Sequence, residues 1–175
     1  VDVAFEAAGA GGIPILKSLG EGLAANHINW VAGIINGTGN YILTEMEQGG
    51  RAFQEVLEEA QSLGYAEADP TFDVEGVDAA HKLTIIASIA FGIPLQFSKV
   101  YMEGISRITI EDVKSAAQFG YRIKHLGIAK DTGHGIELRV HPTLIPRETM
   151  LSAVNGVMNA IMIDGDAVGP TMFYG

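Results

Sequence analysis

The sequence contains no cysteine, which excludes disulfide bonds, thiolate metal ligands and cysteine nucleophiles. Basic residues are also few, because 11 Lys and Arg stand against 21 Asp and Glu, for a formal net charge of -10. Such a charge argues against nucleic acid or an anionic membrane as a partner. No apolar run approaches the length of a membrane span, and the first residues lack the basic start of a signal peptide. We therefore expect a cytoplasmic protein.

The chain also lacks an initiator methionine, and it stops at residues 172–175, directly after an apolar run. We interpret both features as those of a fragment. Its 175 residues, 47% of them apolar, suit one globular domain with a core of its own.

Helical spacing of apolar residues is concentrated in the first half of the chain. Pro14 suits the first turn of a helix, because a missing N–H is harmless there. A buried strand is predicted over residues 28–35, which are apolar and rich in branched side chains. The predicted helices cover residues 14–23, 41–47, 53–60 and 78–90, and a short strand is predicted over residues 3–5.

The last third of the chain has the alternation of strands instead. Residues 136–141 alternate apolar and polar side chains, and the turn at 131–135 predicts residues 121–130 as the antiparallel neighbour. Asn-Gly at 155–156 and Asp-Gly at 164–165 are further hairpin signals. The prediction is an α+β fold, with a mixed or antiparallel sheet and helices on one of its faces. Such a sheet, with an apolar surplus, also favours pairing with a second copy in a homodimer.

The glycine-rich segment at residues 9–12 has two interpretations. It begins like the dinucleotide fingerprint G-x-G-x-x-G, but Pro14 holds the sixth place and no strand with a terminal acidic residue follows at the ribose-binding distance. The residues themselves favour a plain loop, whose glycines permit positive φ. The alternative is a site for a hard cation, formed by the Glu6 carboxylate and the carbonyl oxygens of the loop.

Residues 34–41 hold a strand end, a glycine turn and the start of a helix. In an ordinary turn, Asn36 and Gly37 would be followed by Thr38 or Asn40 as the helix N-cap. The same parts suit a polar ligand, because N–H groups are exposed at a helix N-terminus. The spacing does not separate these alternatives.

Residues 63–82 hold five carboxylates, one His and one Lys. The Asp-Pro and Glu-Gly pairs disfavour a continuous helix, so we predict a loop over residues 67–73 and a helix from Gly76. Asp78 and Lys82 then share one helix face. They form either a surface ion pair beside a solvated loop, or part of a cleft in which four carboxylates around Lys82 keep its ammonium charged and bind a small polar substrate. The apolar opposite face of the helix favours the cleft.

Other chemistry-bearing residues give weaker patterns. The five His residues are scattered, without a pair at metal-ligand spacing. No Ser lies in a nucleophile elbow. A carboxylate-based metal hydrolase is a further alternative, suggested only by the acidic cluster.

Five segments resemble the homoserine dehydrogenase family, in order and over essentially the whole chain. The most specific is the acidic stretch LGYAEADPTFDVEGVDAAHKL at residues 63–83. The other segments are EAAGAGGIP at 6–14, GIINGT at 33–38, RVHPTLIP at 139–146 and GDAVGPTMFYG at 165–175.

That family reduces L-aspartate 4-semialdehyde to L-homoserine with NADPH or NADH, on the route to threonine and methionine. The resemblance implies that Lys82 donates the proton to the aldehyde oxygen and that Asp78 is its partner. It also implies that Glu67 and the backbone at Gly64 hold the substrate amino acid, with Asp73 close by. The residue types agree, since hydride transfer builds negative charge on an oxygen that an ammonium can stabilise and protonate.

By the same resemblance, Asn36, Gly37 and Thr38 lie near the nicotinamide of NADP or NAD. Gly39 departs from the family pattern, where Ser or Thr is usual, and removes a hydroxyl near that site. The family carries a Rossmann domain that these residues do not include. We therefore expect the isolated chain to fold and dimerise, but to bind NADPH weakly and turn over negligibly. The alternative is a non-catalytic dimerisation or ligand-binding module of the same fold.

The family also binds a monovalent cation, usually sodium, through its first loop. Carried over residue by residue, the ligands are the carboxylate-bearing Glu6 and the backbone carbonyls of Gly9, Gly11 and Ile13. Gly9 departs from the family pattern, where Val is common, so we expect a more mobile loop.

Overall fold

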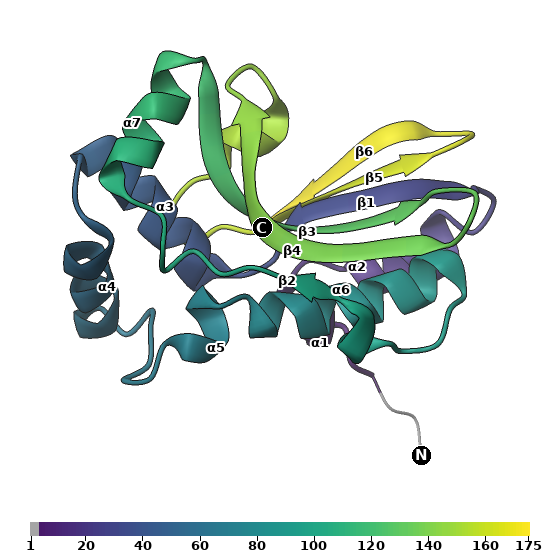
Figure 1. Cartoon of the computed structure of the whole chain (residues 1–175). Helices are drawn as coiled ribbons and strands as arrows, with labels where there is room; N and C mark the ends of the chain where they lie inside the picture. Colours follow the sequence, from purple (N-terminus) through teal and green to yellow (C-terminus); the bar gives the residue numbers. More distant parts are fainter. Residues whose placement is uncertain (1–3) are drawn as a thin grey trace.

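A six-stranded mixed sheet organises the chain, and the computed structural model describes residues 4–175 of it (Figure 1). The strands follow the order β2-β4-β3-β1-β5-β6. Neighbours are antiparallel, except that the short β2 runs parallel to β4. The expected α+β fold with a mixed sheet is confirmed. The strands are β1 Ile28–Ile34, β2 Tyr101–Met102, β3 Tyr121–Asp131, β4 Ile136–Pro146, β5 Ala160–Gly165 and β6 Gly169–Tyr174.

Two of the predicted hairpins are present. β3 and β4 pair along their whole length, from Tyr121 opposite Pro146 to Asp131 opposite Ile136. β5 and β6 form the second hairpin, at the Asp-Gly signal. The Asn-Gly signal at 155–156 is wrong as a hairpin, because this turn follows a short 3-10 helix, η3 (Met150–Ala153), and joins it to β5.

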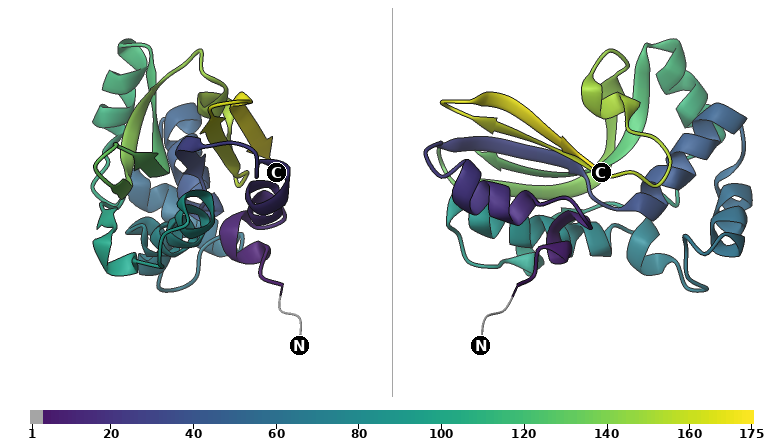
Figure 2. Two further views of the ribbon diagram at one scale, coloured as in Figure 1. Left: turned by 90° about the vertical axis from the view of Figure 1, so that its right-hand side faces the viewer. Right: turned by 180° about the vertical axis from the view of Figure 1, so that it is seen from behind.

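The helices form two groups. In the first, α6 and the segment α2–η1 pack against one face of the sheet, where α2–η1 runs beneath β1 (Figure 2, right). In the second, α3, α4, α5 and α7 gather beside one end of the sheet and enclose a separate small core, and of these helices α3 and α7 contact β3 (Figure 1). The helices are α1 Ala7–Ala10, α2 Ile15–Lys17, the π-helix η1 Ser18–Gly22, α3 Gly37–Gly49, α4 Phe53–Ser62, α5 Thr71–Val74, α6 Val77–Phe91, the 3-10 helix η2 Phe97–Lys99 and α7 Ile110–Gln118.

α3 begins earlier in the chain, and with another N-cap, than predicted from the sequence. Asn36 is the N-cap, because its side-chain oxygen accepts from the N–H of Gly39 at 2.8 Å. Neither Thr38 nor Asn40 caps the helix, since both lie in its first turn. α3 therefore begins four residues before the predicted start at Tyr41.

The first residues also differ from expectation. Of the strand predicted over residues 3–5, Val3 lies outside the described residues, and Ala4 and Phe5 are not in a strand. The glycine-rich stretch is partly helical, because α1 continues to Ala10 before Gly11, at φ 59°, ends it. Residues 67–73 were expected to be a loop, but α5 begins at Thr71, so only the first part is irregular. No helix within residues 4–175 has the length and apolar character needed to cross a membrane.

Candidate active site

A polar pocket of about 400 Å³ lies where β1 ends and where α3, α5 and α6 begin. It brings together residues from three distant parts of the chain, 36–38, 64–82 and 157. Most of the predicted substrate and cofactor residues line it, including both members of the predicted catalytic pair. The lining residues are Asn36, Gly37, Thr38, Gly64, Tyr65, Asp73, Asp78, Lys82 and Val157.

Lys82 is held within the pocket by two acceptors. Its ammonium donates to Asp78 Oδ2 at 2.7 Å and to the Ile35 carbonyl at 3.1 Å. The first contact follows from the i,i+4 spacing on α6, and the second from the position of α6 under the end of β1. Both side chains are about one-fifth exposed, at 23% for Lys82 and 22% for Asp78. Since an ammonium has three N–H groups, the contacts within residues 4–175 leave one for a ligand.

Asn36 connects the carboxylates of the pocket. Its amide nitrogen donates to Asp73 Oδ1 at 2.7 Å and to Asp78 Oδ2 at 2.8 Å, while its oxygen caps α3. The buried amide of Asn36 thus fixes α3, α5 and α6 relative to one another. Asp78 Oδ2 accepts from both Asn36 and Lys82, so its orientation is determined from two sides.

A glycine allows α6 to begin beside the pocket. Gly76 has φ 82°, a conformation that side chains rarely adopt, and a Cβ there would lie 3.1 Å from the His125 ring. That ring is buried, and its Nε2 faces the Glu103 carbonyl at 2.9 Å, so Nε2 carries the proton. Burial lowers the pKa of His125, which keeps the imidazole neutral under the site.

Val157 and Tyr65 reach the pocket without having been predicted. A Cβ on Gly37 would lie 2.7 Å from the Val157 carbonyl oxygen, so the close approach of these two backbones requires glycine. Tyr65 is tied in because its carbonyl accepts from Thr38 Oγ1 at 2.6 Å. Tyr65 lies within the acidic stretch, and so it could have been found. Val157 comes from the turn before β5, and no local pattern marks it.

The carboxylates gather around Lys82 less closely than expected. Asp78 is the one that contacts the ammonium among the described residues, and Asp73 is connected to it through Asn36. Glu75 lies elsewhere, since its carboxylate accepts from Ser106 Oγ at 2.5 Å. The expected crowd of four carboxylates around Lys82 is therefore wrong, because α5 turns the chain between them.

Glu67, predicted to hold the substrate, is exposed and lies outside the pocket lining. Gly64, its predicted companion, lines the pocket at φ 79°. The assignment of Glu67 stays a prediction.

The predicted cation loop has a structural role of its own. The two Glu6 carboxylate oxygens accept the N–H groups of Leu16 at 2.7 Å and Lys17 at 3.0 Å. The Ile13 carbonyl accepts from Ile15 at 2.8 Å. Each of these oxygens has a second lone pair, so the donor set is compatible with a hard cation.

The acidic cluster does not form a ligand set for a transition metal. Within residues 4–175, no group of three or more His, Asp or Glu side chains is placed to hold a metal ion. The hydrolase alternative therefore has no support from the geometry of the described residues.

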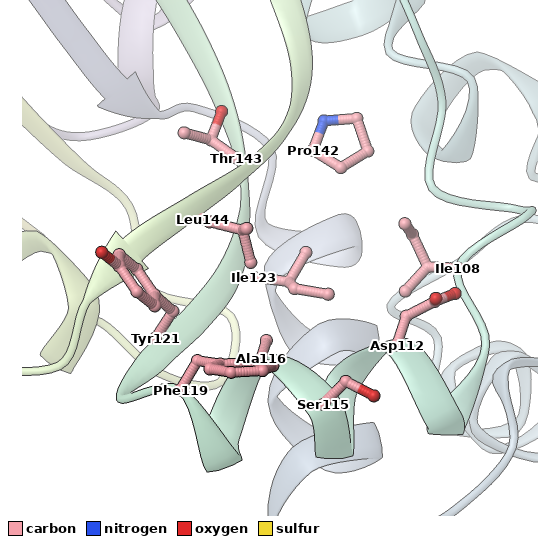
Figure 3. Close-up of a pocket in the computed structure, with 10 residues that line it drawn as sticks. All are labelled: Ile108, Asp112, Ser115, Ala116, Phe119, Tyr121, Ile123, Pro142, Thr143 and Leu144. Carbon is pink, nitrogen blue, oxygen red and sulfur yellow. The ribbon is translucent and has the colours of Figure 1, made fainter.

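A larger pocket lies elsewhere and is mainly apolar. It measures about 710 Å³ and lies between α7 and the ends of β3 and β4, with Phe119, Ile123 and Leu144 among its walls (Figure 3). Asp112 is the only carboxylate among the ten labelled residues, and it is engaged in the capping box of α7 with Thr109. Size alone would favour this groove as a binding site, but the polar pocket has the ammonium and carboxylate groups that proton transfer requires.

Known proteins match this chain over nearly its whole length. Residues 14–175 match the family model described as homoserine dehydrogenase. The chain belongs to the homoserine dehydrogenase family. It is 70% identical, over all of its length, to 40% of the homoserine dehydrogenase of Pseudomonas aeruginosa. Against the homoserine dehydrogenase of Bacillus subtilis, the identity is 51% over 99% of this chain and 40% of the relative. The chain thus spans about 40% of the length of the curated relatives it matches.

Solved structures of this family have the same fold. A homoserine dehydrogenase from Thiobacillus denitrificans superposes with a TM-score of 0.97 and 66% identity, over 99% of this chain and 40% of that one. A hyperthermophilic archaeal homoserine dehydrogenase in complex with NADPH superposes with a TM-score of 0.78 and 26% identity, over 94% of this chain and 46% of that one.

Proposed function

We propose that this chain supplies the substrate-binding and proton-donating part of an enzyme that interconverts L-homoserine and L-aspartate 4-semialdehyde, on the route to threonine and methionine. The observation that carries the proposal is the Lys82 ammonium, which lies in a polar pocket 2.7 Å from Asp78 and keeps one N–H for a ligand. The family membership supports the same reaction.

The proposed proton transfer starts from this geometry. NADPH or NADH, when bound, would supply the hydride that the aldehyde carbon of the substrate accepts. Negative charge then develops on the aldehyde oxygen, and the free N–H of Lys82 stabilises this oxygen and protonates it. Asp78 fixes the direction of the Lys82 ammonium, because Asn36 holds the same carboxylate from the other side. In the oxidation of homoserine, Lys82 accepts the proton.

The rest of the pocket is assigned to the amino-acid part of the substrate and to the nicotinamide. Asp73 lies beside Asp78, and an anionic wall of this kind favours the substrate's ammonium group. The backbone at Gly64 and the Glu67 side chain complete the substrate site in this proposal. Asn36, Gly37 and Thr38 border the nicotinamide, while most of the NADP or NAD binding belongs to a dinucleotide-binding domain outside these 175 residues.

A monovalent cation, taken to be Na⁺, belongs to the first loop in this proposal. Glu6 and the carbonyls of Gly9, Gly11 and Ile13 are its ligands, and they lie near the start of α2. Bound there, the ion would add to the stability of the loop. Titrating the chain with NaCl against choline chloride should raise the melting temperature in the sodium series only.

We also propose a homodimer through the sheet face opposite α6. Ile128, Ala32, Met162 and Met172 are cross-strand partners in one row. Strand alternation puts this row on the face opposite Val31, which belongs to the helix-side core. All four are half-buried apolar residues. Met162→Glu should shift the sedimentation coefficient from dimer to monomer, and a monomeric wild-type chain would contradict the proposal.

The test of the proposed function compares two proteins. A full-length protein that carries this chain together with a dinucleotide-binding domain should reduce NADP⁺ or NAD⁺ in the presence of L-homoserine, and the 175-residue chain should do so negligibly. No homoserine-dependent reduction by the full-length protein would leave the alternative, a non-catalytic dimerisation or ligand-binding module.

A further inference from the structure

Three buried polar side chains form hydrogen bonds with one short segment of the chain. Asn40 and Thr44 lie on α3, and Lys124 lies on β3; their exposed fractions are 1%, 3% and 1%. All three donate to or accept from residues 154–158, which connect η3 to β5 and belong to no helix or strand.

Lys124 is the unusual member of this group. Its ammonium donates to the Val154 carbonyl at 2.5 Å, to Asn40 Oδ1 at 3.0 Å and more distantly to Asn155 Oδ1 at 3.4 Å. None of these acceptors is a carboxylate, so the charge is solvated by neutral oxygens alone. An apolar side chain of similar length would fill the same space without the desolvation of an ammonium. Packing alone therefore does not require a lysine here.

Asn40 and Thr44 hold the rest of the segment. The Asn40 amide donates to the carbonyls of Val154 at 3.2 Å and Met158 at 3.0 Å, and so it spans the segment from end to end. Thr44 Oγ1 accepts the N–H of Gly156 at 3.2 Å. With Lys124, these contacts replace the backbone pairing that a strand or helix would provide.

The tip of the segment forms part of the active-site pocket. Val157 is 41% exposed and lines the pocket next to Gly37 and Thr38. Its carbonyl lies so close to Gly37 that a Cβ there would be 2.7 Å away. A small displacement of residues 154–158 would therefore change the pocket wall directly.

We propose that Lys124, with Asn40 and Thr44, is a positioning residue for the active site, which holds residues 154–158 so that Val157 forms the pocket wall beside Gly37. The inference rests on the proposed function, since this wall borders the part of the pocket assigned to the nicotinamide. Lys124 does not contact the reacting atoms, and it acts through Val157.

The first experiment is steady-state kinetics of the full-length protein. Lys124→Met should raise the KM of the dinucleotide about tenfold and change kcat by less than about threefold, because a loosened wall weakens binding in the ground state and transition state alike. Lys130→Met, an exposed lysine on the same strand, is the control and should change neither constant. A folded Lys124→Met protein with an unchanged dinucleotide KM would overturn the proposal. An inactive wild type would instead refute the proposed function.

The second experiment needs no activity and uses the 175-residue chain. Because the chain has no cysteine, Lys124→Cys introduces a single thiol, whose thiolate displaces bromide from 2-bromoethylamine in denaturant and rebuilds an ammonium of similar length. After refolding, the Val157 methyl signals in a ¹³C spectrum should differ from wild type in the unalkylated protein and return after alkylation. Identical signals in all three proteins would refute the proposal. If neither Lys124 variant folds, Thr44→Val leaves Lys124 in place and removes the Gly156 contact, together with the hydrogen bond that Thr44 Oγ1 donates to the Asn40 carbonyl within α3. This variant should move the same signals, and no movement would count against the proposal.

Discussion

Two lysines in this chain lie only partly open to water or not at all, and their surroundings are opposite. Lys82 has a carboxylate partner, Asp78, and its side chain is 23% exposed in a polar pocket. Lys124 is 1% exposed and is surrounded by neutral oxygens from Asn40, Val154 and Asn155. Both ammonium groups are hydrogen-bonded, but only Lys82 has an N–H directed to space that a ligand can occupy.

The difference separates chemistry from positioning. A proton donor has to reach its substrate and recover its proton from solvent, and the partly exposed, carboxylate-paired Lys82 satisfies both conditions. Burial, and to a smaller extent the nearby Arg122, lower the pKa of Lys124 to about 8, while Glu47 opposes this shift. A lysine placed in this way holds the chain together and exchanges no proton with a ligand.

The largest expected effect is on Lys82. In the full-length protein, Lys82→Ala should lower kcat by about 10²–10⁴-fold, the usual contribution of a general acid. Circular dichroism and the melting temperature should stay close to wild type, because the side chain is partly exposed. A kcat within a fewfold of wild type would refute Lys82 as the proton donor, and the contrast between Lys82 and Lys124 would then have no functional meaning.

The second effect concerns the stability due to Lys124. Its folded pKa of about 8 lies below the ordinary 10.5, so the unfolded chain binds more protons between these pH values. The free energy of unfolding of the wild type, minus that of Lys124→Met, should therefore be lowest below pH 8. It should rise by about 3 kcal/mol between pH 8 and pH 10.5. Urea unfolding of both proteins across this range measures the difference. If the difference in unfolding free energy did not change with pH, the Lys124 ammonium would be better solvated than its contacts indicate.

The third effect tests the ion pair at Lys82. Asp78→Asn keeps a hydrogen-bond acceptor but loses the charge, so kcat should fall by about tenfold, close to the difference between a charged and a neutral hydrogen bond. The kinetics of the full-length protein measure this. If Asp78→Asn were as damaging as Lys82→Ala, Asp78 would have a direct role in the chemistry as well.

The smallest effect is expected at Lys130, an exposed lysine on the same strand as Lys124. Lys130→Met should change the free energy of unfolding by less than about 0.5 kcal/mol at any pH between 7 and 10. A larger change would show that urea unfolding responds to the loss of any lysine on β3, and the result for Lys124 would then need a different control.

The residues that interact locally could be predicted from the sequence. Asp78 and Lys82 are one helical turn apart, so a helix at this position brings them together whatever surrounds it. The β3–β4 hairpin follows in the same way from alternation and a short turn. The family motifs added the chemical role that we propose for Lys82, which spacing alone left open.

The sequence by itself determined which helix has the ion pair and that β3–β4 and β5–β6 form hairpins, because each of these depends on neighbours within a few residues. It also determined which family the chain resembles, through short motifs along its length. Only the tertiary structure decided that Asn36 joins two aspartates, that Glu75 turns away from the site and that Val157 closes the pocket. It also decided that Lys124, in a strand where a lysine would ordinarily face water, is buried. The physical reason is that burial and long-range hydrogen bonds depend on how β1, β3 and β5 pair, and no local pattern records that pairing.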